Sequence, residues 1–315
     1  MNHPALHIPI LLIIGPPRSG TSILGRILGT HPAVSTWVEP YFVWDRFFRD
    51  APHDERTAKD ASATVCSQIR RDFENFRKGM GADIVADKSP RNCLRIPFTQ
   101  QVFPEARYLF ISRDGRDAVL SIQAQWKRKE AVFSRERSRR QRKQLSTILG
   151  KWLARRPLWR FRLRALGFEI GPWYLRGRKG MLNPVRWEGR FGWGPRFQGW
   201  QQMIDELEPI QFYAHQWAAC AREMMRDNPR IPAEQKFEMR YEDFVDRPEE
   251  ILRRLLAFLE LELPSGFMAN IPPIMKGNYG KWKSAFSSRE LSTIGPILEA
   301  PLIEMGYEHE SNWYA

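Results

Sequence analysis

The segment that most constrains the fold is IIGPPRSGTS, residues 13–22, where an apolar run meets a glycine-containing turn. The run itself, residues 8–14, is typical of a parallel strand that is buried on both faces. We expect a helix over 19–28, because Gly29 marks its end. A glycine-bearing turn between a strand and a helix presents backbone N–H groups and the positive end of the helix dipole. The segment therefore indicates an anion-binding site.

The rest of the chain repeats this alternation of strand, turn and helix. We predict further strands over 83–88, 106–113 and 236–241, and helices over 115–126, 211–226 and 247–261. Strands that alternate with helices in this way are typical of a parallel sheet covered on both faces. The predicted fold is therefore α/β, a P-loop-like doubly wound parallel sheet flanked by helices, in a single domain over 1–315.

Residues 127–200 break this pattern, and we interpret them as a basic, Trp-rich insertion. Between Lys127 and Arg196 the chain has 21 lysines and arginines against 4 acidic residues, so the net charge of +13 is concentrated there. Three interpretations stay open: an acidic acceptor, an anionic membrane surface, or a solvated cationic face. Nucleic acid is disfavoured, because no base-reading motif accompanies the charge.

The turn differs from the loop of P-loop NTPases in the position of its cationic residue. Those enzymes place a lysine where this chain has Thr21, and the next hydroxyl residue holds Mg²⁺. Here Arg18 supplies the charge from within the loop, and its fork suits an oxyanion without a metal. A nucleotide kinase is therefore the alternative enzyme, and it requires the lysine that is absent from this position.

A second anion-binding motif follows the strand at 106–113. In SRDGRDAVLS, Arg113 is expected at the carboxyl end of that strand, where ligands bind in open α/β sheets. Ser121 follows two helical turns later. Alternatively, Arg113 pairs with Asp114 or Asp117. Together with the first loop, the motif predicts a ligand with two separated anionic groups.

Four motifs in the same order resemble the sulfotransferases that use 3′-phosphoadenosine 5′-phosphosulfate (PAPS). They are PPRSGTS (16–22), RDGRDAVLS (113–121), RYEDFVDRPEEIL (240–252) and MKGNYGKWKSAF (275–286). The resemblance implies that the 5′-phosphosulfate is bound by Pro17, Arg18, Ser19, Gly20, Thr21 and Ser22. It also implies a 3′-phosphate site made by Arg113, Ser121, Lys276 and Gly277, with Tyr241 near the adenine. Met275 departs from the family pattern, which has arginine there.

The same resemblance implies three catalytic residues. Glu39, in THPAVSTWVEP, matches the glutamate base of the protein-tyrosine and bacterial or carbohydrate-type enzymes. Lys88, in DKSPRN, matches a lysine near the transferring group, and Arg18 faces the leaving phosphate. Pro90 stands where cytosolic members have a catalytic histidine, which favours Glu39 as the base. A lone glutamate before Pro40 has an ordinary alternative, as a helix cap or an ion-pair partner.

These residues predict a metal-free transfer of a sulfuryl group to a hydroxyl, or less readily an amine, of a carbohydrate, glycolipid or other large acceptor. The non-enzyme alternative is a basic module, with a vestigial nucleotide fold, that binds a membrane or nucleic acid. Three scattered cysteines and the absence of a signal-peptide pattern favour a cytoplasmic protein, with membrane association through 127–200 left open. The acceptor and the oligomeric state cannot be inferred from these residues.

Overall fold

The computed structural model describes residues 8–144, 187–188 and 190–315. The chain forms two compact units, of which the first contains Met1–Gln123 and Gly194–Ala315 and the second Ala124–Trp193. The predicted insertion lies mostly in the second unit, and its residues 145–186 and 189 fall outside the described residues. Arg196 and Trp200, at its end, are buried and belong to the first unit.

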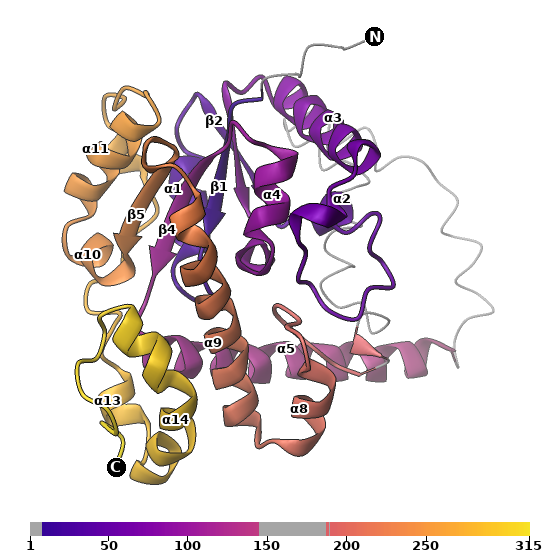
Figure 1. Ribbon diagram of the computed structural model, residues 1–315, viewed down its shortest axis with the longest axis vertical. Helices are drawn as coiled ribbons and strands as arrows, with labels where there is room; N and C mark the ends of the chain where they lie inside the picture. The colour runs from indigo at the N-terminus through magenta and orange to yellow at the C-terminus, as the bar shows by residue number, and fades with distance from the viewer. Residues whose placement is uncertain (1–7, 145–186, 189) are drawn as a thin grey trace. The chain divides into compact units, whose positions relative to one another are not determined.

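The first unit is built on a parallel five-stranded sheet with the order β2-β3-β1-β4-β5. Its strands are β1 (Ile10–Ile14), β2 (Val34–Val38), β3 (Ile84–Lys88), β4 (Arg107–Ser112) and β5 (Lys236–Arg240). The central strand β1 pairs with β3 on one side and β4 on the other, with Ile13 opposite Lys88 and Leu109. All five strands run in the same direction, so their carboxyl ends share one edge (Figure 1).

One face of the sheet is covered by α1 (Thr21–Leu28) and α11 (Pro248–Phe258). Leu11 and Ile13 of β1 share a core with Leu24 of α1 and Leu252 of α11, all fully buried. Helix α1 has its apolar residues on one side, which is the pattern that places a helix on a sheet. Burying a leucine of this kind contributes about 1.5–3 kcal/mol.

The opposite face carries α2 (Tyr41–Trp44), α3 (Ala63–Met80) and α4 (Ile96–Val102). The Tyr108 hydroxyl lies 3.3 Å from the Thr99 hydroxyl of α4, whereas its neighbour Leu109 points into the other core. Aromatic rings fill this layer, with Phe73 5.3 Å from Trp44 and 5.2 Å from Phe103 between ring centres. Because helices cover both faces, the predicted doubly wound α/β fold is confirmed.

The remaining α-helices of the described chain lie between β4 and β5 or after β5 in the sequence. They are α5 (Gly115–Gln144), α8 (Trp200–Glu206), α9 (Pro209–Asp227), α10 (Tyr241–Asp246), α12 (Phe267–Asn270), α13 (Trp282–Ala285) and α14 (Ser288–Glu304). Helix α5 continues well beyond its predicted end at residue 126. Within the second unit, the buried Trp126 ring lies 5.8 Å from Trp187 and 5.4 Å from Phe191.

The four strands predicted from the sequence are confirmed, but β2 was missed. Its sequence, VSTWV, contains two adjacent polar residues and shows neither the continuous apolar run of β1 nor the apolar–polar alternation of β5. As an edge strand, β2 is only partly buried, so its pattern resembles a linker. No helix among residues 8–144, 187–188 and 190–315 has the length and hydropathy needed to cross a membrane.

Candidate active site

The predicted site residues gather along the carboxyl edge of the sheet. Glu39 directly follows β2 and Lys88 ends β3, while the loop at 15–20 follows β1. On the other side, Arg113 follows β4 and Tyr241 follows β5. The strand order therefore places these groups in the order Glu39, Lys88, loop, Arg113 and Tyr241 along one edge. This is the edge at which open α/β sheets bind ligands.

The loop between β1 and α1 has the backbone of an anion site. Arg18 and Gly20 have positive φ angles of 71° and 101°, and the Ser19 hydroxyl donates to the Pro16 carbonyl at 2.7 Å. The tight turn leads directly into α1, whose first N–H groups have no acceptor within the helix. Thr21 is buried at this helix start, and Ser22 is exposed beside it. Pro17 is buried in the turn.

Position 20 requires a glycine for two reasons: its positive φ angle and the close approach of the Tyr241 ring. A Cβ atom at this position would lie 2.5 Å from the Tyr241 ring, closer than real Cβ contacts come. The residue after β5 therefore packs directly on the loop after β1. Tyr241 is buried, and its ring lies 4.4 Å from the guanidinium carbon of Arg113.

Arg113 joins the two predicted anion motifs. Its Nη1 donates to the Arg18 carbonyl at 2.9 Å, and Arg18 Nε donates to the Ser121 hydroxyl at 2.9 Å. The Arg113 Nε atom is buried and makes no hydrogen bond within the described part of the chain. The alternative pairing of Arg113 with Asp114 or Asp117 is not observed there, because those carboxylates bind other groups.

A distant segment closes over Arg113. Its Nη2 donates to the Asn278 carbonyl at 2.8 Å, and the Asn278 amide donates to the Tyr241 hydroxyl at 2.8 Å. Asp117 of α5 accepts hydrogen bonds from the backbone N–H groups of Gly280 and Trp282, the latter at 3.0 Å. These contacts hold residues 278–282 across the site.

The predicted phosphate-binding residues of this segment are less enclosed. Lys276 and Gly277 form an exposed turn, in which Gly277 has a φ of 65°. Met275 is 66% exposed, so it is not a core residue. The segment thus brings Asn278 to Arg113 while Lys276 stays at the surface.

Glu39 and Lys88 form a close ion pair at the other end of the site. Lys88 Nζ lies 2.5 Å from Glu39 Oε1, and the Glu39 N–H donates to the Lys88 carbonyl at 3.0 Å. Lys88 is only 5% exposed, so it is not a solvated lysine of the turn after β3. Glu39 does not cap α2 through its side chain. Of the two ordinary alternatives for Glu39, the structure shows the ion pair, and its partner is Lys88, a predicted residue of the site itself.

Gly25 explains how α1 comes so close to Lys88. A Cβ atom at Gly25 would lie 3.3 Å from two carbons of the Lys88 side chain and 3.2 Å from Thr36. A glycine inside a helix costs about 1 kcal/mol relative to alanine. Here it allows the lysine stem to pass along the helix, a role that the sequence pattern did not reveal.

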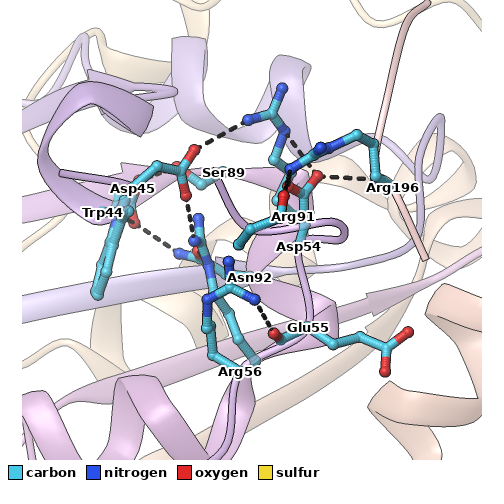
Figure 2. Close-up of polar contacts among 12 residues, drawn as sticks. Trp44, Asp45, Asp54, Glu55, Arg56, Ser89, Arg91, Asn92 and Arg196 are labelled. Atoms are coloured by element: carbon cyan, nitrogen blue, oxygen red, sulfur yellow. Dashed lines mark hydrogen bonds and ion pairs between the residues drawn. The ribbon is translucent and has the colours of Figure 1, made fainter. Parts of the chain in front are cut away.

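Asp87, beside Lys88, was also missed by the sequence analysis. Its fully buried carboxylate accepts hydrogen bonds from Trp44 Nε1 at 2.8 Å, Ser89 Oγ at 2.6 Å and Asn92 Nδ2 at 2.8 Å. Burial raises the pKa of Asp87 to about 6, although these three donors act to lower it. Trp44, Ser89 and Asn92 appear in Figure 2, which shows how closely the DKSPRN segment and α2 are joined.

No three His, Cys, Asp or Glu side chains group as a metal site among the residues that the structure describes. What the site offers to a ligand is a set of cations: Arg18, Arg113 and Lys88, on three neighbouring strand ends. Cations at this spacing suit a ligand with several oxyanion groups.

Comparison with known proteins identifies this arrangement. A family model described as "Sulfotransferase family" matches residues 9–167 and 193–265. Protein-tyrosine sulfotransferase A of Caenorhabditis elegans is 28% identical over 137 residues, covering 36% of this chain and 33% of that protein. Nodulation protein NoeE of Sinorhizobium fredii is 22% identical over 132 residues, covering 37% and 32%. The chain thus spans about a third of the length of these curated relatives.

Solved structures support the fold. The sulfotransferase domain from the curacin biosynthetic pathway aligns with a TM-score of 0.52 at 13% identity, covering 96% of this chain and 98% of that domain. Sulfotransferase STF9 from Mycobacterium avium aligns with a TM-score of 0.50 at 14% identity, covering 98% and 79%. At this identity, the likeness concerns the architecture.

Proposed function

Because the chain belongs to the sulfotransferase family, we propose that it transfers a sulfuryl group from PAPS to a hydroxyl group of a large acceptor. The observation that carries this proposal is the order of groups along the sheet edge. A carboxylate, a lysine, an anion loop, an arginine and a tyrosine follow one another there, from Glu39 to Tyr241. The carboxylate would act as the base. The four groups after it would face, in turn, the sulfuryl group, the 5′-phosphate, the 3′-phosphate and the adenine of PAPS.

The donor would be held by the loop and by the residues that close over it. Residues 17–22 would bind the 5′-phosphosulfate, while Arg113, Ser121, Lys276 and Gly277 would bind the 3′-phosphate. The buried Arg113 Nε, which has no hydrogen bond within the described chain, fits this assignment. Tyr241 would lie against the adenine, since its ring is held between Gly20 and Arg113.

Glu39 and Lys88 would carry the chemistry. The acceptor oxygen forms a bond to sulfur while the bond from sulfur to the bridging phosphate oxygen breaks, and 3′,5′-adenosine bisphosphate leaves. Glu39 takes the acceptor's proton, and Lys88 and Arg18 stabilise the charge that develops on the oxygens. The proposed transfer needs neither Mg²⁺ nor a lysine at the position of Thr21, because Arg18 and Lys88 supply the positive charge.

The acceptor is proposed to be a carbohydrate, a glycolipid or another large molecule, with a hydroxyl preferred over an amine. The support is indirect: the basic segment 127–200 suits an anionic acceptor or membrane surface. One relative is named for tyrosine in proteins and another for nodulation, so a tyrosyl peptide belongs among the acceptors to be tested.

A thermal shift experiment tests the nucleotide. Ligands that bind the native state raise its stability, so 3′,5′-adenosine bisphosphate should raise the melting temperature in the presence of EDTA. Stabilisation by ATP-Mg²⁺ alone would contradict the proposal and favour a kinase. Incubation with [³⁵S]PAPS and a panel of a tyrosyl peptide, a chito-oligosaccharide and octyl glucoside then reports the acceptor class.

A further inference from the structure

A buried ionic cluster lies behind the Glu39–Lys88 pair. It joins side chains from four separate stretches of the chain, all of them at least nine-tenths buried (Figure 2). Its members, called the ionic cluster below, are Asp45, Asp54, Arg91, Arg95 and Arg196. Isolated buried charges are costly, so a cluster of this kind persists only when its geometry satisfies them.

Arg91 lies at the centre of the ionic cluster. Its Nη1 is 3.1 Å from Asp45 Oδ2, and its Nε is 3.3 Å from Asp54 Oδ2. The flat guanidinium also covers the ring of Tyr41, with 3.8 Å between its central carbon and the ring centre. A planar fork can make these three contacts at once, and the point charge of a lysine cannot.

Tyr41 carries this constraint to the site. Its N–H donates to the Glu39 carbonyl at 2.7 Å. Arg91 is therefore linked to Glu39 through a single residue, Tyr41, whose ring it covers. Glu39 itself has a φ of 53°, in the left-handed region that non-glycine residues avoid. Such a conformation persists only where the surroundings hold it.

The charge of Arg91, like its contacts, links it to the segment that carries Glu39. Burial alone lowers the pKa of Arg91, but the facing Asp54, Tyr41, Asp45 and Glu39 raise it, and the net change is upward. Glu39 is therefore close enough to interact with the Arg91 charge. The guanidinium thus stays charged while it faces the segment that carries the base.

We propose that Arg91 is a positioning residue, which holds the backbone of residues 39–41 so that the Glu39 carboxylate meets Lys88. This inference rests on the proposed sulfuryl transfer. Removal of Arg91 would release Tyr41 and leave Asp45 and Asp54 with fewer partners. The base would then lose its alignment, whereas the donor loop after β1 keeps its separate contacts, between Arg113 and the Arg18 carbonyl and between Arg18 and Ser121.

The test is a double-mutant cycle between Arg91 and Glu39. Turnover is measured as 3′,5′-adenosine bisphosphate formed from PAPS with the acceptor panel present. We expect Arg91→Gln to lower kcat about 100-fold, the loss typical of a misplaced group, with the Kd of 3′,5′-adenosine bisphosphate unchanged. Arg91→Lys should retain more activity. In a Glu39→Gln background, Arg91→Gln should add little further loss.

Arg70→Gln is the matched control. Arg70 also forms a forked ion pair, with Glu105 at 2.6 Å, and lies 5.3 Å from the Phe103 ring centre, but far from the site in the fold. The Arg70→Gln variant should have a lower melting temperature, while the kcat of its folded protein should be unchanged. Equal kcat losses in Arg91→Gln and Arg70→Gln, or additive losses in the cycle, would overturn the inference.

Failure of the proposed function gives a different result. In that case the wild-type chain binds no 3′,5′-adenosine bisphosphate or consumes no PAPS. The cycle is then measured on urea unfolding, where Arg91→Gln and Glu39→Gln should still be non-additive if Arg91 holds residues 39–41. Additive unfolding effects would overturn the positioning role by themselves.

Discussion

The two ends of the site are built by different means. At the donor end, after β1, β4 and β5, the groups are held by backbone: a loop with two positive φ angles, and carbonyls that accept from Arg113. At the proposed acceptor end, after β2 and β3, Glu39 and Lys88 pair with each other, and the neighbouring groups that we propose hold them, Asp87 and the ionic cluster, are buried side chains. Both ends depend on partners from distant segments, since Arg113 at the first end donates to the Asn278 carbonyl, but within the described chain only the second end is surrounded by a buried ionic cluster.

This difference implies different sensitivities to mutation. Changes at the donor end should weaken nucleotide binding, because its groups face a ligand with fixed charges. Changes at the acceptor end should lower turnover or stability, because its groups face one another and the reacting atoms.

The largest effect is expected from Glu39→Gln. Loss of the base should lower kcat by about 10²–10⁴-fold, while nucleotide affinity is retained. Glu238→Gln is the matched control, since Glu238 also pairs with a lysine, Lys236 at 3.0 Å, but is half exposed on β5. Steady-state kinetics and calorimetry with 3′,5′-adenosine bisphosphate measure the two quantities. A large loss of affinity with kcat retained would reverse the assignment of the acceptor end.

The next effect concerns stability and pH. Because the folded state raises the pKa of Asp87 from 3.8 to about 6, this group stabilises the fold below pH 4, and that contribution is lost as the pH rises through 6. The loss amounts to about 3 kcal/mol. In Asp87→Asn the loss should disappear, since the amide oxygen can still accept from Trp44 and Asn92 and the amide can donate to Ser89.

Urea unfolding at pH 4.5 and 7.5 measures the larger part of this change, because the unfolded-state pKa of 3.8 lies below the lower pH. Asp54→Asn is a control of opposite sign, because Arg91 and Arg196 lower the pKa of Asp54 against the effect of its burial. Asp54 therefore stabilises the fold at neutral pH, and its replacement should cost stability there. If Asp87→Asn showed the same pH dependence as wild type, the buried carboxylate would not be the titrating group.

At the donor end, Arg113→Gln should weaken 3′,5′-adenosine bisphosphate about 10–100-fold, as expected for lost charge-assisted hydrogen bonds. The affinity for 5′-AMP, which lacks the 3′-phosphate, should change much less. Arg107→Gln, at the opposite end of the same strand, serves as the control. Equal losses for both nucleotides would place Arg113 away from the 3′-phosphate.

The same division explains what could be predicted from the sequence. The four predicted strands and the loop after β1 were found because each has a local signal: apolar residues in a run or in alternation for the strands, and glycine for the loop. The edge strand β2 was missed because half-exposed Ser35 and Thr36 interrupt its pattern. The links from Asp87 to Trp44 and from Asp117 to Gly280 join residues 43 and 163 positions apart, which no local spacing reveals.

The smallest expected effect comes from introducing an arginine at position 275, where the resemblance to cytosolic sulfotransferases implies one. Met275 is exposed on the turn next to Lys276, so Met275→Arg adds a cation at low cost to the fold. An exposed charge contact contributes about 0.2–1 kcal/mol, so affinity for 3′,5′-adenosine bisphosphate should rise by a few-fold at most, and the gain should vanish in high salt. Met80→Arg, at an exposed methionine of α3, adds the same net charge and should leave affinity unchanged. Equal gains in both variants would show that long-range charge alone is at work, and a gain for 5′-AMP as large as for the bisphosphate would place position 275 outside the 3′-phosphate site.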